Sequence, residues 1–145
     1  MSKHLSASPE QQTAEAYMLK SLEKNLGICF NREAKLSGVH PDAIDPINKV
    51  VVEAYAHIGA VKGGQFHKIQ GDILKLALIE KKWGKGWRKI LCFASDDAAK
   101  YVQGKSWVAE AARAFGVEIQ VVHLPLEQRN NVVAAQKRQR MVNPS

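Results

Sequence analysis

Residues 41–55 read PDAIDPINKVVVEAY and contain two strand-like segments joined by a turn. The β-branched run at 50–52 is typical of a buried strand, and the DPIN sequence at 45–48 has the composition of a tight turn. The two segments are therefore expected to pair as an antiparallel hairpin. Such pairing would bring two carboxylates, Asp42 and Glu53, to one end of a sheet.

The segments on either side of this hairpin predict alternating helices and strands. Upstream, apolar residues at helical spacing end at Gly27, a natural C-cap; these are Ala14, Met18, Leu22 and Leu26. Residues 28–38 are short and mixed, consistent with a strand entering a turn. Downstream, spacings of 3, 4 and 3 predict a helix from about Gly64 to Trp83, through Phe66, Ile69, Ile73 and Leu76. A buried strand at 88–95, a helix that starts after Ser95 and resumes at 106–115, and a strand at 117–125 follow.

This order predicts an α/β fold with a mixed central sheet flanked by helices. The early strands are joined by tight turns and should be antiparallel, whereas the last two are joined through a helix and should be parallel. With 145 residues the chain fits one domain. Its expected parts are a flexible N-terminal arm at 1–12, an α/β domain at 13–125 and a basic C-terminal helix or tail at 126–145.

The composition is that of a basic globular protein, with a formal net charge of +7 and a pI of about 9.5. A positive balance favours a polyanionic partner, because each lysine or arginine that meets a phosphate releases a counterion. Solubility alone is the alternative explanation. The sequence has no stretch resembling a signal peptide or a membrane span, so a cytoplasmic protein that does not contact a membrane is expected. No CxxC or HxxxH pairing indicates zinc.

The two carboxylates of the hairpin are suited to a hard cation. Mg²⁺ commonly binds one or two carboxylates, several waters and a substrate phosphate. The structural alternative is that acids are simply common at turns, and Asp45 beside a proline belongs to that class. The next helix favours a site, because polar residues spaced 3, 3, 4 and 3 border its buried face; these are Lys62, Gln65, Lys68, Asp72 and Lys75. A polar helix flank whose lysines extend into water remains the alternative.

The runs AEAYMLKSLEKNLG, PDAI and VVVEAY, followed by the Gln- and Lys-bearing helix, resemble the PD-(D/E)xK nuclease superfamily, the fold of many restriction endonucleases and Holliday-junction resolvases. The resemblance covers roughly residues 13 to 124 and implies a restriction-endonuclease-like αβββαβ core. Glu15 matches the acid of the first helix, Pro41-Asp42 the PD pair and Glu53 the glutamate of the ExK motif. It implies a DNA nuclease that uses Mg²⁺ or Mn²⁺, with Asp42 and Glu53 as metal ligands.

The sequence departs from this pattern at Tyr55, where the family has lysine. A phenol supplies no positive charge at neutral pH. In some members the lysine has moved to the following helix, where Lys68, or else Lys62, would take its place. Gln65 would then position water or phosphate. If neither lysine reaches the site, the alternative is a catalytically inactive module of the same fold that binds nucleic acid or a protein partner.

Three further expectations concern partners. Nucleic acid is expected to contact basic residues outside the catalytic set, namely Lys75, Lys137, Arg138 and Arg140. Leu74 and Leu78 fall away from the buried stripe of their helix, so they either pack under another element or form a subunit contact, and a homodimer is expected. A weaker alternative is a small α/β domain that binds an unrelated anion, although VKGGQ at 61–65 matches neither known phosphate fingerprint.

Overall fold

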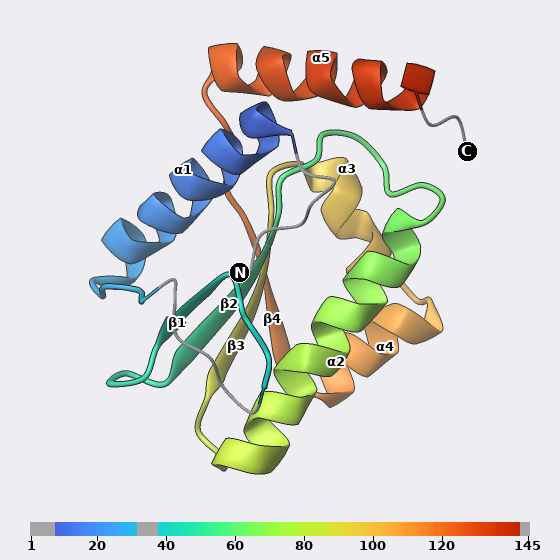
Figure 1. Cartoon of the computed structure of the whole chain (residues 1–145). Coiled ribbons are helices and arrows are strands. Elements are labelled where there is room, and N and C mark those ends of the chain that lie inside the picture. The colour runs from blue at the N-terminus through green and yellow to red at the C-terminus, as the bar shows by residue number, and fades with distance from the viewer. Residues whose placement is uncertain (1–7, 32–37, 143–145) are drawn as a thin grey trace.

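The computed structural model describes residues 8–31 and 38–142, which form a four-stranded sheet covered by helices on both faces (Figure 1). The elements in chain order are α1 (Pro9–Leu26), β1 (Ala43–Asp45), β2 (Val50–Tyr55), α2 (Gln65–Trp83), β3 (Arg88–Phe93), α3 (Asp96–Ala99), the 3₁₀ helix η1 (Lys100–Val102), α4 (Trp107–Ala114), β4 (Val117–Val121) and α5 (Leu126–Val142). The predictions for 1–7, for 32–37 and for 143–145 lie outside the described residues. No described helix has the length and apolar character needed to cross a membrane.

The sheet is mixed, as predicted. Its strand order is β1-β2-β3-β4, with β1 antiparallel to β2 and the other two pairs parallel. The hairpin places Ile44 opposite Val51, and Asp45 accepts hydrogen bonds from the backbone N–H groups of Ile47 and Asn48. This confirms the interpretation of Asp45 as a turn residue. The parallel pairs are connected through α2 and through α3, η1 and α4, as parallel strands require.

The period of two along the strands divides the core between the two faces of the sheet. One face carries Tyr55 and Leu91 and packs on α2 and α4. The other carries Val52 and Ile90 and packs on α1 and α5. Figure 1 shows α1 and α5 on one side of the sheet and α2 and α4 on the other. Because Glu53 alternates with Val52, its side chain points toward α2.

The structure differs from two predicted boundaries, although the helix that was one of the two alternatives for the C-terminal segment is present as α5. The N-terminal arm does not extend to residue 12, because α1 begins at Pro9, after a capping box in which Ser8 and Gln11 exchange side-chain to backbone hydrogen bonds. The C-terminal segment is a helix that belongs to the domain, since Val132 of α5 is buried in the core on the α1 side of the sheet. The predicted helix end at Gly27 is confirmed, with φ of 69°.

Candidate active site

The hairpin brings Asp42 and Glu53 together, as the sequence predicts. The backbone N–H of Asp42 donates to Glu53 Oε1 at 3.2 Å, and Asp42 Oδ2 accepts from the backbone N–H of Ala54 at 2.8 Å. The pairing of β1 with β2 places Ala43 opposite Val52, which sets the residues just outside this pair beside each other. Each carboxylate is thus held by the backbone next to the other acid.

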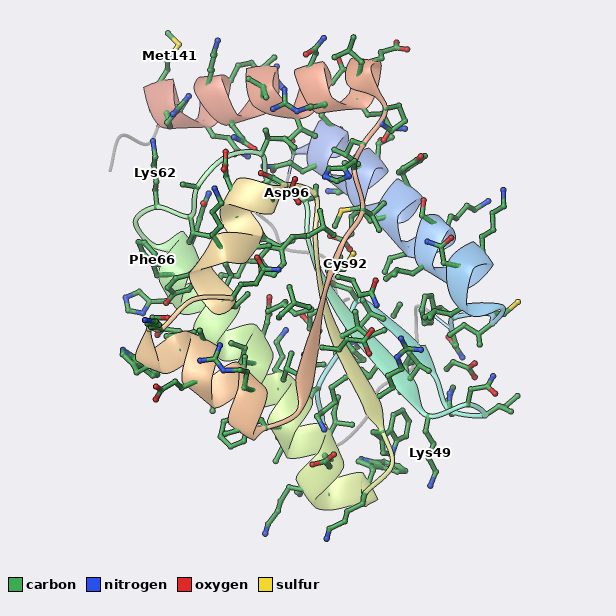
Figure 2. All side chains as sticks on the ribbon, turned by 180° about the vertical axis from the view of Figure 1, so that it is seen from behind. Lys49, Lys62, Phe66, Cys92, Asp96 and Met141 are labelled. Carbon is green, nitrogen blue, oxygen red and sulfur yellow. The ribbon has the colours of Figure 1, made fainter. Side chains whose placement is uncertain are left out.

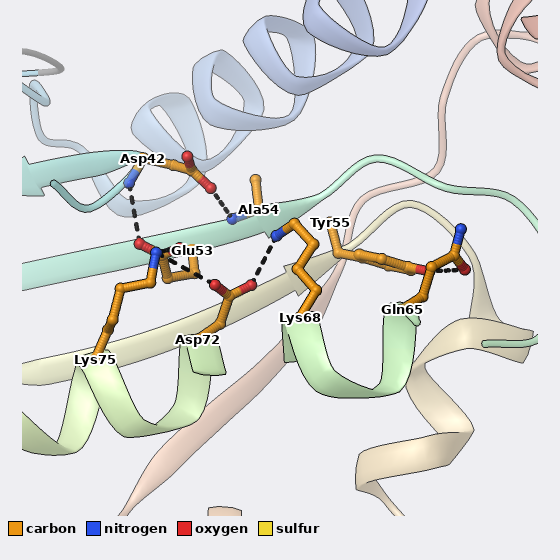
Figure 3. Close-up of polar contacts among 8 residues, drawn as sticks. All are labelled: Asp42, Glu53, Ala54, Tyr55, Gln65, Lys68, Asp72 and Lys75. Carbon is orange, nitrogen blue, oxygen red and sulfur yellow. Dashed lines mark hydrogen bonds and ion pairs between the residues drawn. The ribbon is translucent and has the colours of Figure 1, made fainter. Parts of the chain in front are cut away.

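Helix α2 supplies two lysines and a third acid to this pair (Figure 3). Lys75 Nζ lies 3.2 Å from Glu53 Oε2 and 3.4 Å from Asp72 Oδ1, and Lys68 Nζ lies 2.9 Å from Asp72 Oδ2. Asp72 therefore bridges the two ammonium groups. We call these five residues (Asp42, Glu53, Lys68, Asp72 and Lys75) the acid–lysine cluster; its formal charge with all groups ionised is −1, from three carboxylates and two ammonium groups.

Burial and neighbouring charge set the ionisation of the cluster. Burial, followed by the charges of Asp42 and Asp72, raises the pKa of Glu53 well above its ordinary value, while Lys75 acts in the opposite direction. Burial alone would lower the pKa values of Lys68 and Lys75, but the adjacent carboxylates raise both. The lysines consequently stay charged, and the acids create a local site for positive charge.

The cluster is open to solvent only on the lysine side. Glu53 is 0% exposed, whereas the Lys68 and Lys75 side chains are 25% and 32% exposed. Two adjoining carboxylates in a negative environment fit Mg²⁺, which needs few protein ligands. Within residues 8–31 and 38–142, no group of three or more His, Cys, Asp or Glu side chains is arranged to hold a metal ion. A metal held by Asp42 and Glu53 alone would need substrate and water to complete its shell, and Lys75 would have to withdraw from Glu53.

Tyr55 belongs to a separate polar network. Its ring stacks on His57 with centroids 4.7 Å apart, and its hydroxyl donates to Gln65 Oε1. Gln65 Nε2 lies 3.1 Å from His57 Nδ1. Burial raises the pKa of Tyr55 above its ordinary value, so the phenol stays neutral. Because its amide is held by these two neighbours, Gln65 would have to leave them to position water or phosphate.

The other predicted site residues lie outside the cluster. Glu15 lies on α1, which covers the opposite face of the sheet from α2. Lys62 is exposed in the loop before α2, as Figure 2 shows. The three predicted nucleic-acid contacts at the C-terminus all lie on α5; Lys137 and Arg140 are exposed, and Arg138 pairs with Glu10 at 2.9 Å.

Two roles were missed from the sequence. Lys75 was predicted to contact nucleic acid, yet its ammonium lies against Glu53 inside the cluster. Asp72 was noted only as part of the polar stripe, although it is buried and joins both lysines. The available signal was spacing, since Lys68 and Lys75 lie four residues before and three residues after Asp72 and so share its face of the helix.

A depression of about 500 Å³ lies apart from the cluster, lined by Val61, Phe66, Asp97, Lys100 and Tyr101, with Ala60. Its lining includes none of the five cluster residues. No protein-family model matches the chain, and no curated protein or solved structure matches it either. The proposed function therefore rests on the geometry of the cluster.

Proposed function

We propose that the protein is a Mg²⁺-dependent DNA nuclease of the PD-(D/E)xK type. The observation that carries this proposal is the buried pair of Asp42 and Glu53, faced by the ammonium groups of Lys68 and Lys75. Paired oxygen ligands beside fixed positive charge are what hydrolysis of a phosphodiester requires, because negative charge develops on the phosphate under attack. The net charge of +7 supports a polyanionic substrate.

The order of elements supports the finer assignment of a restriction-endonuclease-like core. Asn31 forms an isolated antiparallel bridge with Ile44 on β1, and its N–H donates to the Ile44 carbonyl at 2.7 Å. If this bridge is counted as a one-residue strand, the chain reads α1, three antiparallel strands, α2 and β3. That is the αβββαβ order of the superfamily, followed here by a further crossover to β4.

The roles of the residues follow from their contacts. A bound Mg²⁺ supplies a water of lowered pKa and stabilises charge on the phosphate. Asp42 and Glu53 hold the metal, and the half-exposed side of the cluster admits the phosphate. Lys68 takes the role of the motif lysine, because Asp72 holds its ammonium on the sheet side of α2. Lys75 pairs with Glu53, and its ammonium would be available to the phosphate if a metal took its place beside that carboxylate.

The test is cleavage of supercoiled plasmid and of branched DNA with Mg²⁺ or Mn²⁺. Asp42→Asn and Glu53→Gln should each lower the rate about 100-fold or more, and Lys68→Met should do so about as strongly. Lys62→Met should have little effect, since Lys62 lies in an exposed loop. Asp97→Asn, at an exposed acid paired with Lys100, is the matched control. Cleavage by Asp42→Asn and Glu53→Gln at the control rate would contradict the proposal.

A second candidate is a catalytically inactive module of this fold that binds nucleic acid. It is favoured by the internal pairing of the cluster, in which Lys75 already occupies the cation position beside Glu53. This function predicts DNA binding that persists in EDTA and weakens with salt, with no cleavage in either metal. Salt-dependent binding should then need the exposed basic residues of α5, Lys137 and Arg140, whereas Glu53→Gln should leave it unchanged.

We also propose a homodimer, because Leu74 and Leu78 are 65% and 40% exposed on the outer face of α2. The two residues lie one helical turn apart and form an apolar strip on that face. Sedimentation of the wild type should show a dimer, and Leu74→Glu with Leu78→Glu should give a monomer. A monomeric wild type at micromolar concentration would refute this part of the proposal.

A further inference from the structure

Exposed lysines gather where α2 ends. Lys81 and Lys82 occupy the last turn of the helix, Lys85 follows in the turn to β3, and all three are exposed. Lys49 lies at the same end, because its carbonyl accepts from the Arg88 N–H at 2.7 Å. Figure 2 shows Lys49 at the opposite end of the molecule from Lys62. We call Lys49, Lys81, Lys82 and Lys85 the basic end.

The charge of the basic end is not cancelled by ion pairs within the described residues. Its four lysines have no ion-pair partner among residues 8–31 and 38–142, whereas the lysines of the acid–lysine cluster are all paired. The two nearby glutamates are already engaged, Glu80 by Lys89 and Glu118 by Arg88. The basic end therefore carries four exposed lysines that no acid in the described part of the chain neutralises.

The basic end is connected to the cluster by the geometry of α2. Lys68, Lys75 and Lys82 are spaced by seven residues, which brings each within about 20° of the last around the helix axis. Lys82 is about 10 Å along the axis from Lys75, at 1.5 Å per residue. One strand can therefore follow the flank of α2 from the cluster to its end.

Trp83, the last residue of α2, adds an exposed aromatic side chain at the same end of the helix. Its side chain is 51% exposed, between Lys82 and the Gly84 that ends the helix. Lysines that track a backbone, combined with an aromatic face on which a base stacks, are the combination that binds single strands. The bases of a continuous duplex are paired and stacked on each other, so they are not available to such a face.

We infer that the end of α2 binds an unpaired DNA strand that leaves the acid–lysine cluster, with Lys81, Lys82 and Lys85 on its phosphates and Trp83 on a base. This inference rests on the proposed nuclease function, since it assigns that function a substrate with a single-stranded arm. It places the strand on the side of the cluster toward the carboxyl end of α2.

The test measures binding of a labelled single-stranded oligonucleotide and of a blunt duplex in EDTA, over a range of salt. Combining Lys81→Gln, Lys82→Gln and Lys85→Gln should reduce the slope of log K against log salt for the single strand by about 2, at about 0.7 per contact. The control combines Lys20→Gln, Lys24→Gln and Lys105→Gln, which removes the same charge from other exposed positions and should leave the slope near that of the wild type. Thermal melts confirm folding of both variants.

Trp83→Leu tests the unpaired base. It should weaken binding of the single strand about tenfold and leave binding of the duplex unchanged. An equal loss for both DNAs, or no loss for either, would overturn the assignment of an unpaired strand. We call the variant that combines Lys81→Gln, Lys82→Gln and Lys85→Gln the patch variant. If its slope and that of its control fall equally, the assignment of these lysines to a DNA-binding surface is wrong.

Cleavage separates this inference from the proposed function. If the wild type cuts no DNA in Mg²⁺ or Mn²⁺ but the salt slope of single-strand binding falls only for the patch variant, the binding surface is supported and the nuclease proposal fails. If the wild type cuts DNA and the patch variant keeps the wild-type salt slope, the nuclease proposal is supported and the proposed binding surface is wrong. When both hold, the patch variant should raise KM for a DNA with a single-stranded arm and leave kcat unchanged.

Discussion

Replacing Glu53 by glutamine should change how the stability of the protein depends on pH. Burial and the charges of Asp42 and Asp72 raise the pKa of Glu53 well above 4.5, and in the unfolded chain it returns to that ordinary value. Between the two values the folded state binds one more proton than the unfolded state. The free energy of unfolding therefore falls as pH rises through this window, at up to about 1.4 kcal/mol per pH unit.

Glu53→Gln removes this contribution while keeping the shape of the side chain and its acceptor for the Asp42 N–H. Once pH exceeds the raised pKa of Glu53, the free energy of unfolding of the variant should exceed that of the wild type. The difference should be about 1.4 kcal/mol for each unit by which the fold raises that pKa. Urea denaturation in EDTA at pH 5, 6, 7 and 8 measures the difference. The free energy of unfolding of Asp97→Asn, a change at an exposed acid, should depend on pH as that of the wild type does. Parallel curves for the wild type and Glu53→Gln would refute the reasoning.

Mg²⁺ should reverse the trend in the wild type, because the metal binds the ionised carboxylate. At a metal concentration 100 times Kd, binding to the folded state alone adds about 2.7 kcal/mol. The rise in Tm with metal should thus be larger at pH 8 than at pH 6. Glu53→Gln should show no such rise at either pH.

Three other substitutions test Asp72, the hydrogen bond of Tyr55 and the end of α1. Asp72→Asn removes the carboxylate that pairs with Lys68, so the pKa of that lysine should fall and the alkaline limb of the cleavage rate should move to lower pH; an unchanged pH–rate profile would rule out this role for Asp72. Tyr55→Phe removes the hydroxyl that Gln65 accepts from, and should cost about 1 kcal/mol in urea denaturation while the cleavage rate stays within about twofold. Gly27→Ala, at φ of 69°, should cost about 1–2 kcal/mol, and an unchanged Tm would contradict a strained position there.

The sheet and its hairpin could be predicted because their causes are local. A β-branched run and the Asp45 turn define β1 and β2, and the helical period of α2 is visible over four buried positions. The start of α1 was predictable in principle, since Ser8 and Gln11 form a capping box three residues apart. The packing of α5 was not, because few of its residues are apolar and it is partly held by contacts such as Gln136 with the Ile58 backbone.

The interior of the site could be predicted only in part, because polarity does not reveal which charges are buried. The acid pair follows from the hairpin register. The burial of Asp72 depends on which side of α2 faces Glu53, and that is settled by the crossover between β2 and β3 rather than by α2 alone. An acid between two lysines on a helix is ordinarily an exposed pairing. Here the face of α2 that carries Lys68, Asp72 and Lys75 lies against the sheet.

The position of Tyr55 explains how charge can be supplied from α2. Residues two apart on a strand share a face, so Glu53 and Tyr55 both point toward α2. A lysine at position 55 would direct its ammonium into the space between β2 and that helix, and Lys68 approaches the same space from the helix, with Nζ 5.9 Å from the Tyr55 ring centroid. The phenol fills the volume beside Phe93 that a lysine stem would leave partly empty. A positive charge facing Glu53 is therefore compatible with an apolar strand end, provided that Asp72 holds the ammonium in place.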